Sequence, residues 1–119
     1  MKDQPAKQPA PATAPDRADI WMTAETVELA RAVADLNDED EALRFLRDLC
    51  TVRELQEFSH RWSVARLLAD GIPYHEISKR TGASSATISR VNHWLRYGRG
   101  GYGLLIERLA RRAARRARA

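Results

Sequence analysis

A stretch of short side chains, most of which carry a hydroxyl group, is followed by a guanidinium and is the part of this 119-residue sequence best suited to contact another molecule. Its members are Ser84, Ser85, Ala86, Thr87, Ser89 and Arg90. Short side chains allow a close approach, their hydroxyl groups donate and accept hydrogen bonds, and a guanidinium pairs with phosphate or with a guanine edge. The expected chemistry is therefore hydrogen bonding to DNA bases and phosphates.

Two short helices joined by a tight turn would position this stretch. The first helix is expected over residues 73–80, with a proline at its first position, where no amide hydrogen is needed. Gly82 supplies the positive φ of the turn without steric cost. Ser84 or Ser85 then caps the second helix. Residues 73–96 thus have the organisation of a helix-turn-helix, whose second helix enters the major groove of DNA.

The apolar spacing around the turn agrees with this unit. The positions that such a unit must bury are Ile77, Ala83, Ile88 and Val91. Ser78 and Ala86 are small enough to lie at the contact between the two helices. An ordinary helical hairpin would show the same spacing, and the Ser/Thr-rich start of the second helix favours DNA binding over that alternative.

The predicted DNA-contacting surface extends to the first helix, where Lys79 and Arg80 are candidates for phosphate contacts. The full predicted set is His75, Ser78, Lys79, Arg80, Ser84, Ser85, Ala86, Thr87, Ser89 and Arg90. Charge agrees with it: residues 1–50 carry 6 basic and 11 acidic side chains, whereas residues 51–119 carry 14 basic and 5 acidic ones. Basic side chains displace counterions from DNA phosphates, so double-stranded DNA is the expected partner.

The remaining elements are also predicted to be helical, which makes the fold class all-α. The first helix begins after Thr23 as N-cap, and Asn37 is expected to cap the second. Thr51 and Glu54 form a capping box that opens a long third helix. The apolar stripe of that third helix is Leu55, Phe58, Trp62, Ala65, Leu68 and Ala69. Residues 98–103 are predicted to be a glycine-rich loop before a last helix over residues 104–119.

Composition suggests one domain between two tails. Residues 1–19 are rich in proline and alanine and are predicted to be disordered. Residues 20–109 are the helical DNA-binding domain, and residues 110–119 are a basic Ala/Arg tail. That tail is either a solvated helix end or an extra phosphate clamp.

Other classes of protein find little support. Three scattered histidines and a lone Cys50 give no metal motif, no disulfide and no catalytic arrangement, so we expect neither an enzyme nor a cofactor. No apolar run is long enough to span a membrane, and the N-terminus has no signal peptide. The expected location is the cytoplasm. A protein-interaction module on the same fold is the alternative of another class.

The run TGASSATISRVN, preceded by Tyr74-His75-Glu76-Ile77, resembles the signature of the Trp repressor superfamily, and more closely its YerC/YecD-type branch. The resemblance covers about residues 38–109. It implies a six-helix, intertwined homodimer that binds a palindromic operator, in bacteria and as a repressor.

The resemblance also implies a possible effector pocket. Thr51, Arg61 and Arg90 match positions that hold an amino-acid corepressor in the Trp repressor. Val91 and Trp94 replace smaller residues of that pocket and would fill space where a ligand lies, which argues against tryptophan itself. An amino-acid- or indole-sensing repressor is therefore the alternative to a constitutive one. For Thr51, capping is the competing role.

Overall fold

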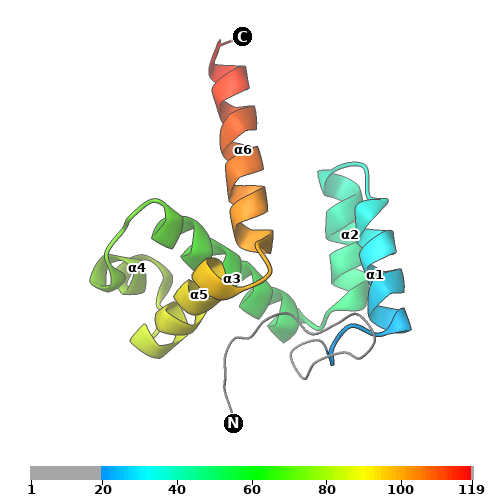
Figure 1. Ribbon diagram of the computed structural model, residues 1–119, viewed down its shortest axis with the longest axis horizontal. Helices are drawn as coiled ribbons and strands as arrows, with labels where there is room; N and C mark the ends of the chain where they lie inside the picture. The colour runs from blue at the N-terminus through cyan, green and yellow to red at the C-terminus, as the bar shows by residue number, and fades with distance from the viewer. Residues whose placement is uncertain (1–19, 119) are drawn as a thin grey trace, which may run out of the picture. The chain divides into compact units, whose positions relative to one another are not determined.

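The computed structural model describes residues 20–118, which form six α-helices and no strand (Figure 1). The helices are α1 (Ala24–Ala34), α2 (Glu39–Leu49), α3 (Val52–Ala69), α4 (Tyr74–Thr81), α5 (Ser85–Tyr97) and α6 (Gly101–Arg118). The predicted all-α fold is confirmed. None of these six helices is long and apolar enough to cross a membrane. The expected disorder of residues 1–19 concerns a part of the chain that lies outside the described residues.

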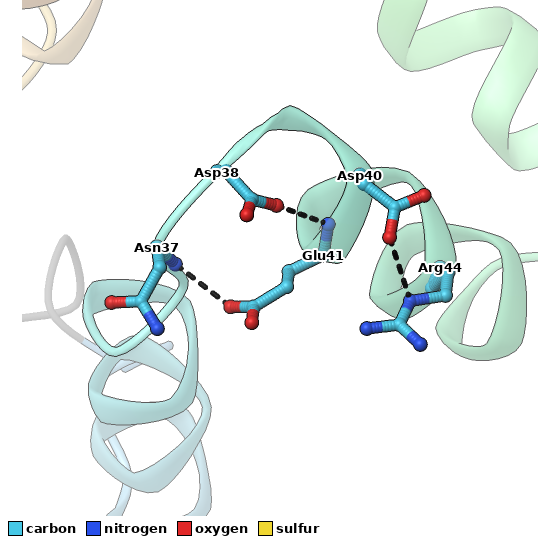
Figure 2. A network of polar contacts seen from close by, with 5 residues as sticks. All are labelled: Asn37, Asp38, Asp40, Glu41 and Arg44. Atoms are coloured by element: carbon cyan, nitrogen blue, oxygen red, sulfur yellow. Dashed lines mark hydrogen bonds and ion pairs between the residues drawn. The ribbon is translucent and has the colours of Figure 1, made fainter.

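The chain divides between Leu46 and Arg47 into two compact units. In the first, Thr23 caps α1 as predicted, since its side chain accepts a hydrogen bond from the Thr26 amide at 3.1 Å. The prediction that Asn37 caps α2 is wrong. Figure 2 shows that Asp38 does so instead, because its Oδ1 accepts the Glu41 amide at 2.9 Å. Glu41 in turn accepts the Asn37 amide, so the two carboxylates satisfy two backbone donors.

The second unit is organised around α3, which contacts α4, α5 and α6. Its N-terminus carries the predicted capping box, with Thr51 and Glu54 each accepting the other's backbone amide hydrogen. The core of this unit consists of Val64, Ala65, Ile77, Ala83, Ile88 and Val91. Burial of this apolar surface is the main force that holds α4 and α5 against α3.

One face of α3 was missed by the predicted stripe. Val64 is fully buried, whereas Phe58 is 45% exposed. The helix packs on two sides. Val64 and Ala65 belong to the core that α3 shares with α4 and α5. Trp62 stacks on Tyr102 of α6, with 6.2 Å between the ring centroids. A single stripe cannot describe a helix that is packed on two sides.

The last helix begins earlier than predicted. Gly98 caps α5 and Gly100 has a φ of 83°, but α6 already begins at Gly101, so the predicted loop over residues 98–103 is too long. Tyr102 and Ile106 of its first turns pack against the core. This packing holds the start of the helix, which explains why two glycines are tolerated inside it.

Candidate nucleic-acid interface

The turn between α4 and α5 has the geometry that the sequence predicted. Gly82 adopts φ 78° and ψ 4°, and its amide donates to the Ser78 carbonyl at 2.7 Å. The Thr81 hydroxyl donates to the Ile77 carbonyl at 2.8 Å and accepts the Ala83 amide hydrogen at 3.1 Å. These bonds leave the turn with little freedom, so the direction of α5 relative to α4 is fixed by the backbone.

Pro73 was predicted to be the first residue of the helix, but it lies one position before it. It precedes α4 as the N-cap residue, with ψ 156°, and Tyr74 is the first helical residue. No side chain caps this end. A proline at the N-cap has no amide hydrogen that needs a partner, and its fixed φ still favours the start of the helix.

All four positions predicted to be buried are buried. Ile77 and Ile88 are 0% exposed, Val91 is 2% and Ala83 is 3% exposed. Ser78 is half-buried, in agreement with a place near the contact between the helices, but Ala86 is exposed, so that part of the prediction is wrong. Ala86 lies in the first turn of α5, on the outer surface of the helix-turn-helix.

The first turn of α5 presents a small polar surface. The Ser84 side chain caps the helix by accepting the Thr87 amide hydrogen at 3.1 Å, and the two hydroxyl oxygens also lie 3.1 Å apart. Ser85, Ser89 and Arg90 are exposed, whereas Thr87 is half-buried. The cap therefore satisfies the helix end internally, and the exposed hydroxyl groups remain available to another molecule.

The α4 side of the unit adds positive charge. His75, Lys79 and Arg80 are all exposed. Arg80 is held by Glu76, with its Nε 2.9 Å from the carboxylate Oε2 one helical turn earlier. Such an exposed pair contributes little to stability, but it orients the guanidinium. The helix-turn-helix thus has hydroxyl groups at the start of α5 and cations on the adjoining helix.

An open pocket of about 350 Å³ lies between α3 and α5. It is lined by Glu57, His60, Arg61, Thr87, Arg90, Val91 and Trp94. Of the predicted effector residues, Arg61, Arg90 and Trp94 come together there. Thr51 is not among the lining residues and acts in the capping box. Each helix contributes residues that share one of its faces, 57–60–61 on α3 and 87–90–91–94 on α5, but only the packing of the two helices brings these faces together.

The cationic and aromatic groups of this pocket are only partly covered. The Arg61 guanidinium lies over the Phe58 ring, 5.1 Å from its centroid, which is cation–π geometry. Trp94 is 57% exposed and lies edge-to-face with His93, at 5.3 Å between ring centroids. Trp94 therefore forms a wall of the pocket and is not a core residue.

Comparisons with known proteins agree with this geometry. The family model described as Trp repressor protein matches residues 24–110. The uncharacterized protein YerC of Bacillus subtilis (strain 168) is 44% identical over 82 residues, which cover 69% of this chain and 79% of YerC.

Two solved structures are also similar. A TrpR-like protein from Eubacterium eligens ATCC 27750 is 44% identical with a TM-score of 0.70, over 74% of this chain and 91% of that one. A candidate Trp repressor from Staphylococcus aureus is 35% identical with a TM-score of 0.74, over 81% of this chain and 96% of that one.

Proposed function

This chain belongs to the Trp repressor family, and on that premise we propose that it is a repressor that binds a palindromic DNA operator as a homodimer. The family is one of DNA-binding regulators. The observation that carries the proposal is the exposed surface of small polar side chains at the start of α5, beside a turn in which the Gly82 and Ala83 amides are both hydrogen-bonded. A helix with such a surface can approach base edges closely.

Each helix has its own part in the proposed complex. Lys79 and Arg80 of α4 contact phosphates, because their cations are exposed beside the turn. Ser85, Ala86 and Ser89 of α5 face the bases, with hydroxyl groups for hydrogen bonds and a methyl group for the thymine methyl. Phosphate contacts position the helix, and base contacts choose the sequence.

The proposed homodimer is supported by apolar side chains that the single chain leaves exposed. On α6 these are Leu104, Leu105 and Leu109, at 45–52% exposure, and on α1 they are Val27, Leu29 and Val33. A chain this small gains stability when a second copy covers such surface. A two-fold dimer would present two α5 helices about 34 Å apart, which matches successive turns of the major groove.

The test is a titration of duplexes that the protein itself selects from a random pool, together with unselected duplexes. We also assign a base contact to Arg90, which is exposed and directly follows Ser89, so Arg90→Ala is expected to lower the preference for the selected duplex by about tenfold, because one good base contact is worth about 1–3 kcal/mol. Arg96→Ala is the matched control, because Arg96 lies in the last turn of the same helix and bonds to Asn92. Equal binding of all duplexes by the wild-type protein would contradict the proposal. Repression is then tested with a reporter gene under the selected site.

A second candidate, control by a small molecule, is favoured by the pocket between α3 and α5. Arg61 and Arg90 supply two guanidinium groups, and Trp94 supplies an aromatic wall. These groups suit a small carboxylate with an apolar part. Calorimetry with tryptophan and other indole acids tests it: heat of binding that is lost in Arg61→Ala supports an effector, and no heat with any of them contradicts this candidate.

A further inference from the structure

The last helix continues beyond the part of the chain that matches the family. The family model ends at residue 110, whereas α6 continues without interruption to Arg118. Five arginines lie in this extension, at positions 111, 112, 115, 116 and 118, and Arg108 lies about one helical turn before the first of them. Glu107 is the last acidic residue, and it pairs with Arg111 at 3.5 Å. The extension therefore carries a concentrated positive charge that family membership does not explain.

Local structure explains why this segment is a helix although it has no packing partner in its own unit. Alanine and arginine are among the residues with the highest helix propensity, and cations in the last turn interact favourably with the helix dipole. Every residue from Glu107 to Arg118 is exposed, in contrast with Tyr102 and Ile106 in the first turns. Figure 1 shows the end of α6 directed away from α4 and α5 of the same unit.

The charge is confined to one side of the extension. At 3.6 residues per turn, the six arginines from Arg108 to Arg118 cover an arc of about 160°. The opposite arc is formed by Ala110, Ala113, Ala114 and Ala117. A solvated helix end has no need to gather all its cations on one side, whereas a helix that lies along a polyanion does.

We propose that the extension of α6, residues 111–118, is a second DNA-binding surface, which binds phosphates of any sequence independently of the helix-turn-helix. Guanidinium groups pair with phosphate oxygens in bidentate geometry. An anionic membrane would be the other polyanion, but the face opposite the arginines consists of alanine, and a membrane-surface helix needs Leu, Phe or Trp there. The polar side chains of the extension are all arginines, whose guanidinium groups can pair with a row of phosphates on any duplex, so its binding is expected to depend little on sequence.

The length of the extension gives the size of the effect. From Arg111 to Arg118 the helix rises by about 10 Å, and one DNA strand presents a phosphate about every 3.4 Å, so about three phosphates lie within reach. Loss of three phosphate contacts is expected to reduce the slope of log affinity against log salt concentration by about 2 to 3.

The experiment compares two full-length variants on a duplex of random sequence. In one, the five arginines of the extension are replaced by glutamine: Arg111, Arg112, Arg115, Arg116 and Arg118. In the charge-matched control, five cations of the first half are replaced by glutamine: Lys2, Lys7, Arg17, Arg31 and Arg44. Each variant loses five positive charges from a net charge of +4, so both carry −1. Far-ultraviolet circular dichroism of both variants checks that the helices persist.

A slope that flattens by about 2 to 3 in the extension variant and stays unchanged in the control supports the proposal. Equal slopes in both variants and the wild type would overturn it, and so would equal flattening in both, since net charge alone would then explain the effect. Binding to vesicles of equal parts phosphatidylglycerol and phosphatidylcholine that is lost only in the extension variant, with an unchanged slope, would assign the surface to membranes. The helix-turn-helix proposal is tested by sequence preference, so either can fail without the other.

Discussion

Replacement of Gly82 tests whether the turn of the helix-turn-helix depends on a left-handed backbone. Gly82 has a φ of 78°, and a Cβ built on it would meet nothing within 4 Å. A substitution there therefore changes the conformational energy of the backbone and leaves the packing unchanged. Few positions in the chain separate these two effects so cleanly.

The expected magnitude follows from this geometry. The left-handed conformation costs a residue with a Cβ about 1–2 kcal/mol. Alanine offsets about 0.4–1 kcal/mol of this cost, because it reduces the conformational entropy of the unfolded chain. Gly82→Ala is therefore expected to lower the free energy of unfolding by about 1 kcal/mol. Gly82→Asn should cost less, because asparagine tolerates this region, and Gly82→Val should cost more, because a β-branched side chain does not.

The assay is urea-induced unfolding followed by circular dichroism, at one fixed protein concentration because the stability of the proposed dimer would depend on it. Gly103→Ala is the control, because Gly103 lies inside α6, has no positive φ, and a Cβ built on it meets nothing within 4 Å. Alanine at this position is expected to raise the free energy of unfolding by up to about 1 kcal/mol. An Asn variant no more stable than the Val variant, or an Ala variant as stable as the wild type, would refute the reasoning.

Three further substitutions test the packing and the caps, each by the same unfolding measurement. Ser84→Ala removes the N-cap of α5 and should lower the free energy of unfolding by about 1 kcal/mol. Ser85→Ala, at the exposed neighbouring position, should change it little, and equal losses in both variants would contradict the assigned cap. Ile88→Ala empties a fully buried position and should cost about 2–5 kcal/mol, so a loss below about 1 kcal/mol would show that the core is not packed as described. Gly98→Ala would place a Cβ against the Trp94 carbonyl oxygen and should lower the free energy of unfolding by about 1–3 kcal/mol, because the connection between α5 and α6 must shift. Gly101→Ala is the control, since a Cβ there meets nothing within 4 Å.

The helix-turn-helix was the most predictable part of the chain because its rules are local. A left-handed glycine, a serine cap and an apolar spacing are each recognised from a few neighbouring residues. Gly82, Ser84 and the buried Ile77 and Ile88 follow these rules. The prediction of Asn37 as the cap of α2 failed, because aspartate suits a cap as well as asparagine and the backbone geometry places Asp38 there.

Features that depend on contacts distant in sequence were harder to predict. Val64 was missed because α3 packs on two sides, and a single stripe describes one. The start of α6 was placed too late, because glycines have low helix propensity and only the packing of Tyr102 holds them in the helix. The pocket between α3 and α5 combines residues about 30 positions apart, so no local pattern defines it.

The central claim, that the start of α5 reads a DNA sequence, is tested most directly by selection from a pool of randomised duplexes. The wild-type protein is expected to enrich one palindromic sequence, with half-site centres about 10 base pairs apart. A variant that carries both Ser85→Ala and Ser89→Ala should shift or lose the enriched bases while still binding the pool. A wild-type pool that shows no enrichment after repeated rounds, or the same enriched bases with the variant, would contradict this account.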